Sequence, residues 1–403
     1  MVSSTIDHMV AITVFLAAIL LFIGLFNQTI QTAVIYQRHR ATATKASDLL
    51  DNMLLNPGIP INWGQNDSIP TGFGLQDPEF TQYKISSFSL MRLSSATGTP
   101  VYYPKTGQTY SNITVGDQNF LLVSHGSTLN YSTALDLLGI RNQYGFQLTF
   151  TPIVTVSITE DHSANPLRLS VNAYGTGFPL ANAYVTYCML SVSLNGGQAS
   201  YKIAYANATA NEEGSVTLEF PEVTSSTSSY SFIAYVHVGG LVGVGYHERV
   251  SGTEYVVPFV DNLSEGRILI AHSFDIEYTD PPKSEVKYNA TFVYLAEDFT
   301  LREMPLENSY GHVNSGEGDP YEVVNIPTDN PGILIITYKK STVEGGLVMM
   351  PWGVSSLAFP VVFGGDPMTQ EWVATDMRQV MVGGVTYQAT LALWSLEGYQ
   401  VIG

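Results

Sequence analysis

The chain has few of the features on which small secreted domains rely. Only one of its 403 residues, Cys188, is a cysteine, so no intramolecular disulfide can form. Many small extracellular domains need disulfides, whereas larger β-domains are stable through packing alone. Cys188 stands in an apolar run and no histidine lies near it in sequence. We therefore interpret it as a small buried residue and not as a nucleophile.

Charge is also scarce, at 13% of residues, about half the usual share for a soluble protein. The 17 Lys and Arg residues are outnumbered by 35 Asp and Glu residues, which gives a formal net charge of −18. Nucleic-acid binding needs a basic stripe to contact phosphates, so nucleic acid is excluded as a partner. The same charge argues against docking on anionic lipid headgroups beyond any inserted segment.

Local motifs for catalysis or metal binding are missing. The eight histidines are scattered, with no H-E-x-x-H and no Cys/His cluster, so no zinc site is predicted. The Gly-rich run 239–245, between His237 and His247, lacks G-x-G-x-x-G spacing and is interpreted as strand and turn. There is no G-x-S-x-G elbow and no P-loop. We expect no catalysis and no cofactor.

Acidic residues cluster in two places, and calcium is the metal to consider there because it binds oxygen ligands. Neither cluster has an EF-hand pattern, so a solvated acidic loop is preferred over a calcium site. The clusters are Asp275, Glu277 and Asp280, and Glu317 and Asp319.

One long apolar run is present, at residues 9–26, with no charge and no Pro. As a helix it is roughly 27 Å long, close to the hydrocarbon thickness of a bilayer. A cleaved signal peptide is the alternative. Residues 1–8 contain no Lys or Arg but carry Asp7, and no A-x-A site follows the run. We expect a retained single-pass membrane anchor, with membrane lipid as its first partner.

The orientation of the anchor has two opposing indications. Arg38, Arg40 and Lys45 follow the run, and the positive-inside rule would place that flank in the cytoplasm. Long domains, however, translocate with little regard to charge. The body also carries N-x-S/T sequons, so we expect it outside. The sequon at Asn27 adjoins the run, and the candidate glycosylation acceptors are Asn66, Asn112, Asn130, Asn207, Asn262 and Asn289.

The helix is expected to continue beyond the membrane. Residues 27–55 contain no Pro and no Gly, and Ala46, Leu49, Leu50 and Met53 form an i, i+3, i+4, i+7 set. The alternative is two helices hinged near residues 36–40. The run 56–58 (Asn-Pro-Gly) should end the helix. A neighbouring subunit or the chain's own body should cover the Leu/Met face.

Short β-patterns dominate after residue 83, so the predicted fold class is mainly β with one long N-terminal α-helix. Four segments are expected: helix and stalk (1–55), a β-rich connecting domain (56–151), a β-sandwich (152–260) and a C-terminal β-rich domain (261–403). Residues 132–139 should form a short helix, residues 195–197 a tight turn, and residues 303–330 a long acidic connection. The strands expected are 120–123, 146–150, 154–158, 167–171, 184–193, 200–206, 215–220, 230–238, 267–272, 291–295, 332–338 and 385–393.

The first 64 residues resemble archaeal type IV pilin-like proteins. The shared design is a short head, an apolar span, a helix that continues outward and then a β-domain. Residues 49–64 (LLDNMLLNPGIPINWG) are similar to the stretch that follows the stalk in some of these proteins. In that family a peptidase cuts after a basic residue ahead of the span, which this sequence lacks. An acidic residue near the new N-terminus aids assembly there. Asp7 is the candidate for that role, and an anion favourable to the helix N-terminus is the alternative.

Residues 171–185 (VNAYGTGFPLANAYV) and 213–221 (EGSVTLEFP) resemble Ig-like surface domains of the invasin and macroglobulin sort. The resemblance implies an Ig-like β-sandwich and no activity, since such domains serve as spacers or adhesive modules.

Several aromatic residues could together form a glycan-binding surface, although core positions are the preferred interpretation for them. They are Tyr102, Tyr103, Trp352, Trp372 and Trp394. We therefore expect a membrane-anchored extracellular structural or adhesive protein, which self-assembles through its helix or contacts cell-envelope proteins. An ectodomain that binds or senses a solute or glycan is the alternative.

Overall fold

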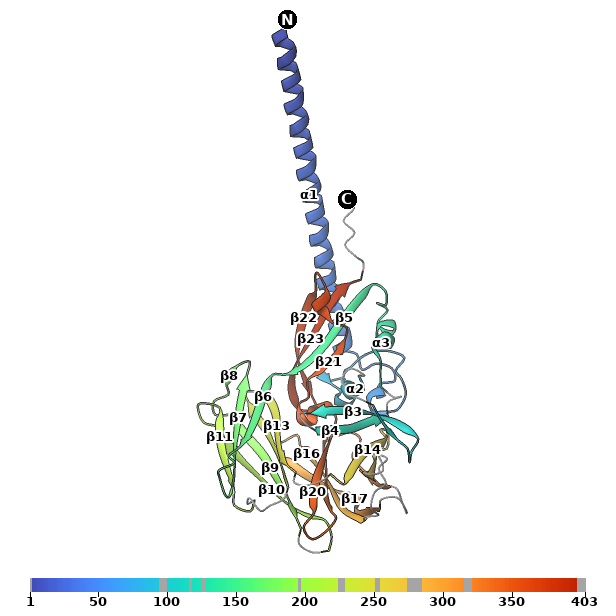
Figure 1. Ribbon diagram of the computed structural model, residues 1–403, viewed down its shortest axis with the longest axis vertical. Coiled ribbons are helices and arrows are strands. Elements are labelled where there is room, and N and C mark those ends of the chain that lie inside the picture. The colour runs from blue at the N-terminus through green and yellow to red at the C-terminus, as the bar shows by residue number, and fades with distance from the viewer. Residues whose placement is uncertain are drawn as a thin grey trace.

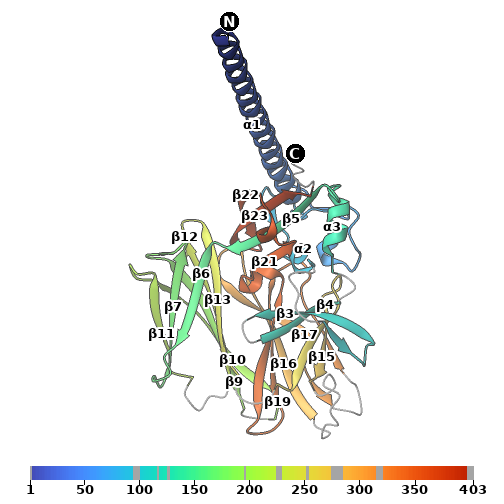
Figure 2. The same ribbon diagram turned by 45° about the horizontal axis from the view of Figure 1, so that its top comes forward.

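One long helix leads into a β-rich body (Figures 1 and 2). The computed structural model describes residues 2–93, 100–115, 118–124, 128–194, 197–223, 229–250, 254–273, 285–314 and 321–396. Helix α1 (Val2–Leu54) is continuous, which confirms the single rod and excludes a hinge near residues 36–40. At 53 residues it is about 80 Å long. The predicted fold class, mainly β with one long N-terminal helix, is confirmed.

The helix ends where the sequence predicts. The Asn56 side chain accepts a hydrogen bond from the Gly58 amide (2.9 Å), and Gly58 has a φ of +86°. A Cβ at this position would lie 2.7 Å from the Gly72 carbonyl oxygen, so the turn requires glycine. The chain then passes through short elements around Trp63: η1 (Trp63–Gln65), α2 (Ser87–Met91) and later α3 (Tyr131–Leu137). Helix α3 confirms the short helix predicted at 132–139, which Gly139 ends with a φ of +65°.

The sheet next to the helix, here called the neck sheet, is assembled from distant parts of the chain. Its strands come from two of the predicted segments, 56–151 and 261–403, so this sheet joins them. Its order is β1-β22-β23-β5-β21. The strands are β1 (Lys84–Ile85), β5 (Tyr144–Pro152), β21 (Val361–Gly364), β22 (Ala374–Val382) and β23 (Val385–Ser395).

The predicted β-sandwich is present with all six predicted strands, and the structure adds β8 and, after the Gly-rich turn, β13. One sheet has the order β10-β9-β12-β13 and the other β11-β7-β6, with β8 paired to β7. Of the turn predicted at 195–197, residues 195 and 196 lie outside the described residues. The strands are β6 (Val154–Glu160), β7 (Leu167–Gly175), β8 (Phe178–Pro179), β9 (Tyr184–Ser193), β10 (Ser200–Thr209), β11 (Ser215–Phe220), β12 (Tyr230–Val238) and β13 (Leu241–Arg249).

Three further sheets complete the body. The largest, here called the C-terminal sheet, has the order β17-β16-β19-β20, and the small sheets are β14-β15-β18 and β2-β3-β4. Two short 3-10 helices, η4 (Val354–Leu357) and η5 (Pro367–Thr369), flank β21. The strands are β2 (Val101–Tyr103), β3 (Gln108–Val115), β4 (Gln118–Ser124), β14 (Val256–Asn262), β15 (Arg267–His272), β16 (Glu285–Leu295), β17 (Leu301–Asn314), β18 (Tyr321–Asn325), β19 (Gly332–Lys339) and β20 (Gly345–Trp352).

The long connection predicted at 303–330 is wrong, because most of it forms strands β17 and β18. Strand β17 lies at the edge of its sheet and pairs with β16 alone among the described strands. An edge strand tolerates charges and Pro305, because one side of it faces solvent. Because of its polar composition, the sequence pattern did not indicate this strand of 14 residues.

The sandwich is not free on both sides. Along β9 and β12, alternate residues such as Val185 and Phe232 face the sandwich interior, while Cys188 and Ile233 belong to the core shared with the C-terminal sheet. Between these two sheets, Ser231 donates a hydrogen bond to the Met349 sulfur (2.8 Å). The sheet β10-β9-β12-β13 is therefore the middle of three layers. This explains why β12 is buried almost continuously along its length.

Candidate functional site: the exposed apolar helix and its arginine clamp

The outer half of α1 is uncovered. Every residue from Ile6 to Arg38 is exposed, and the apolar window in this helix has a mean hydropathy of 2.9. This is the one helix in the described residues that is long and apolar enough to cross a membrane. A signal sequence would meet the same criterion. The most exposed large apolar side chains on it are Met9, Leu20, Leu21, Phe22 and Tyr36.

The uncharged length of α1 matches a whole bilayer. Between Asp7 and Arg38 the chain contains no Asp, Glu, Lys or Arg. These 30 residues span about 45 Å as a helix, which is the thickness of a bilayer with its headgroups. Asp7 is exposed near the outer end of α1. Its predicted role in assembly stays a prediction.

The inner half of α1 is docked on its own body, which decides between the two covers expected for the Leu/Met face. Ala46, Leu49, Leu50 and Met53 are at most 4% exposed, and they share one core with residues of β22 and β23 such as Val380. The predicted i, i+3, i+4, i+7 set is thus confirmed as the docking face.

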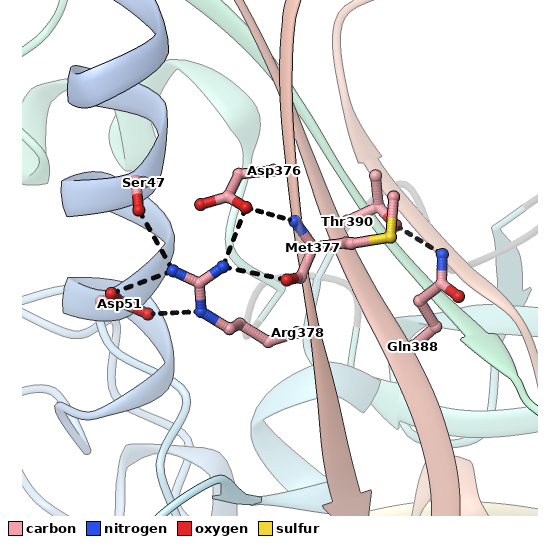
Figure 3. Close-up of polar contacts among 7 residues, drawn as sticks. All are labelled: Ser47, Asp51, Asp376, Met377, Arg378, Gln388 and Thr390. Carbon is pink, nitrogen blue, oxygen red and sulfur yellow. Dashed lines mark hydrogen bonds and ion pairs between the residues drawn. The ribbon is translucent and has the colours of Figure 1, made fainter.

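Arg378 on β22 clamps this docked half of the helix (Figure 3). Its Nε and Nη2 atoms donate to the two carboxylate oxygens of Asp51 at 3.0 and 3.1 Å, and Nη2 also donates to Ser47 Oγ at 3.1 Å. Nη1 donates to Asp376 Oδ1 at 2.8 Å, and the Arg378 side chain is 25% exposed. One guanidinium thus joins two turns of the helix to the neck sheet, in the bidentate geometry that favours Arg over Lys.

The clamp shifts the pKa values of two residues, Arg378 and Asp376. The hydrogen bonds that Arg378 donates to Asp51 and Asp376 raise the pKa of its guanidinium. Burial works against ionisation of Asp376, but hydrogen bonds from Arg378 and Ser47 outweigh it and lower the pKa of this carboxyl. Both shifts favour the charged forms of Arg378 and Asp376.

A second contact marks the level at which the helix leaves the body. The rings of His39 and Trp372 are stacked, with centroids 4.0 Å apart and an interplanar angle of 4°. From Ile6 onward, His39 is the first residue of α1 that is half-buried instead of exposed. Trp372 was a candidate glycan ligand, and the structure instead places it against the helix.

The free and docked faces of α1 point in opposite directions. Nine residues separate Ile30 from His39, which is about two and a half helical turns. Ile30 and Val34 are 46% and 44% exposed and lie one turn apart on the side away from the body. The body therefore cannot cover them, whereas it covers Thr42 and Ala46.

The candidate glycosylation sites differ in their exposure to solvent. Asn130 and Asn207 are exposed; Asn66, Asn262 and Asn289 are half-buried; and the side chain of Asn112, on β3, lies outside the described residues. In three serine sequons the hydroxyl donates to the asparagine side-chain oxygen: Ser68 to Asn66, Ser132 to Asn130 and Ser264 to Asn262. The Asn130 oxygen also caps helix α3 by accepting from the Thr133 amide at 2.9 Å.

The other candidate residues do not converge on a reactive centre. Cys188 is fully buried, and burial raises the pKa of its thiol to about 12. Tyr103, Trp352 and Trp394 are core residues, and Tyr102 is 50% exposed, so no aromatic surface forms among these residues. The described residues contain no group of three or more His, Cys, Asp or Glu side chains that could hold a metal ion. Both acidic clusters, at 275–280 and 317–319, lie outside the described residues.

A cleft and a groove are formed by described residues of the body. A cleft of about 670 Å³ lies where the loop before β1 meets the ends of β16 and β22, and Asp77, Lys84, Phe299 and Asp329 are among its lining residues. A groove of about 470 Å³ runs between the sandwich edges β10 and β11, over Met189, Ile203 and Phe220.

Comparisons with known proteins do not assign a family. No protein-family description and no curated protein sequence matches the chain. Among solved structures, a red sea bream transglutaminase is similar at 10% identity, over 61% of this chain and 37% of that chain, with a TM-score of 0.17. A score this low does not show a shared fold, and we draw nothing from the activity of that enzyme.

Proposed function

We propose that this chain is a single-pass membrane protein that holds a β-rich body outside the cell, where it has a structural or adhesive and non-catalytic role. The observation that supports the proposal is the division of α1 into two halves. One half is uncharged, exposed and as long as a bilayer, and the other is clamped to the body by Arg378. Because the docked half of the helix is fixed to the body, the helix sets the position of the body relative to the membrane.

The proposal includes self-assembly through the helix, as the resemblance to archaeal type IV pilin-like proteins implies. Ile30 and Val34 lie beyond the apolar run 9–26 and face away from the body. An apolar face in that position is stabilised when a neighbouring helix covers it. The same helix segment in a second copy of this chain carries an identical apolar face, and the two faces can pack against each other.

Cysteine cross-linking tests the assembly, because the lone natural thiol is buried and adds no background. Ile30→Cys and Val34→Cys should form disulfide-linked dimers in native membranes under mild oxidation. Gln28→Cys is the matched control and should not, because position 28 lies about 160° around the helix from Ile30 and about 120° from Val34. Equal cross-linking of all three variants, or of none, would count against assembly through this face.

A solute-binding ectodomain is the second candidate, and the cleft of about 670 Å³ is the observation that favours it. Lys84 lies in that cleft with Asp77 and Glu79, at 3.9 and 2.6 Å. Saturable binding of a small ligand that Lys84→Ala abolishes would support this role over a purely structural one.

A further inference from the structure

Strand β10 is an open edge of the sandwich. It pairs with β9 over all ten residues, from Ser200 to Thr209, with no bulge, and it pairs with no other strand that the structure describes. It contains no Pro, and Lys202 is its one charged residue. Natural proteins usually protect such an edge by charges, Pro, bulges or a covering element, because its free backbone groups can pair with another chain.

A sequon lies on this edge. Asn207 and Thr209 are both exposed, and so are the three residues before Asn207. No hydrogen bond within the described residues engages the Asn207 side chain. Its amide nitrogen and the Thr209 hydroxyl are therefore accessible in the folded protein.

The sequon at Asn289 has the opposite environment. Strand β16 is paired on both sides, with β17 and β19, and Asn289 is half-buried in it. Thr291 is 1% exposed, and its hydroxyl donates to Glu303 at 2.8 Å. Tyr201 of the sandwich donates to the same carboxylate. A glycan attached at Asn289 would lie at the contact between the sandwich and the C-terminal sheet.

We propose that Asn207 carries an N-linked glycan and that this glycan covers the free edge of β10. The inference rests on the proposed function, because it requires the body to be outside the cell. In the transfer step a bond forms between Asn207 Nδ2 and C1 of an oligosaccharide. The bond from C1 to the phosphate of a lipid-linked donor breaks, and the amide proton leaves with the phosphate. The attached sugar hydrates the edge and blocks strand addition by other chains.

Trypsin separates the two sequons cleanly. Cleavage after Lys202 and Arg249 gives a peptide with Asn207 as its one sequon, and cleavage after Lys287 and Arg302 does the same for Asn289. In full-length protein from the membranes of its own cells, mass spectrometry should find a glycan on the first peptide and none on the second. Asn207→Gln and Thr209→Ala should abolish the glycan, whereas Thr209→Ser should retain it.

Protease treatment of the same intact cells separates failure of this inference from failure of the proposed function. If the body is cleaved from the cell surface but Asn207 is unmodified, the glycan assignment is overturned and the anchor proposal stands. If the body is protected, the orientation is wrong and the assignment fails with it. A glycan on Asn289 and not on Asn207 would also overturn the assignment. The unglycosylated Asn207→Gln protein should self-associate more than the glycosylated protein in detergent, and equal association would refute the role in edge protection.

Discussion

Arg378 and Asp51 are 327 residues apart in sequence and form a bidentate ion pair at 3.0 and 3.1 Å between the neck sheet and helix α1. This pair fixes the direction of the helix relative to the body. The helix also carries the exposed apolar surface. The ion pair therefore connects the β-rich body to the proposed membrane anchor.

Arg378→Ala should lower the free energy of unfolding by about 1–2 kcal/mol. Four groups on two elements, on Asp51, Ser47, Asp376 and the Met377 carbonyl, lose their donor, although partial exposure of the Arg378 and Asp51 side chains limits the effect. Arg378→Lys should lie between the wild type and Arg378→Ala, because an ammonium cannot make the bidentate contact. Denaturant unfolding in detergent measures the change. Arg302→Ala, which removes an ion pair exposed on both sides, should change stability little, and an equally large loss there would contradict this account.

Leu50→Ala should be more damaging than the loss of the clamp. Leu50 is fully buried at the centre of the docked face, and removing its side chain leaves a cavity that costs about 2–5 kcal/mol. Leu20→Ala, in the exposed half, is the control and should leave unfolding of the body unchanged. Similar losses for both variants would mean that the two halves of α1 are not distinct.

Cys188 should resist thiol reagents until the protein unfolds. Its side chain is fully buried and its pKa is raised to about 12, so neither access nor a thiolate is present near neutral pH. Labelling at pH 8 should be slow without denaturant and complete with it. Rapid labelling of the folded chain would show that the sandwich does not pack on the C-terminal sheet as described.

Acid should destabilise the body through His272. Burial, and secondly the charge of Lys340, lower the pKa of this imidazole from 6.5 to about 4. Between these values the unfolded state binds the additional proton, so stability falls as the pH is lowered through this window, by up to about 3 kcal/mol. His247, whose pKa burial also lowers, acts in the same direction.

His272→Gln should flatten this pH dependence, since an amide does not titrate. The matched control is His162→Gln, because the His162 side chain is 87% exposed, and this variant should keep the wild-type profile. Unfolding measured at several pH values from 7 to 4 provides the comparison. An unchanged profile in His272→Gln would show that the acid sensitivity arises elsewhere.

Local patterns predicted most of the secondary structure. The apolar run, the docking set on α1 and the sandwich strands depend on periodicity within short windows, and the structure has all of them. Strand β17 was missed because an edge strand lacks the alternation that burial imposes.

Most contacts of the candidate site could not be predicted from the sequence. No local pattern indicates that Arg378 would meet Asp51, or Trp372 would meet His39, because sheet topology brings them together. The one available signal was Asp51, a charged residue next to Leu50 and at the flank of the docking face. Likewise, the N-x-S/T motif alone does not distinguish one sequon from another. The strand pairing of β10 and β16 distinguishes Asn207 from Asn289.

Limited proteolysis of intact cells, with antibodies to both ends of the chain, tests directly whether α1 holds the body outside the membrane. If it does, the β-rich body is released while a membrane-bound fragment retains residues 9–26. A body protected until the cells are broken, or a mature protein that is freely soluble and lacks that segment, would rule out this arrangement.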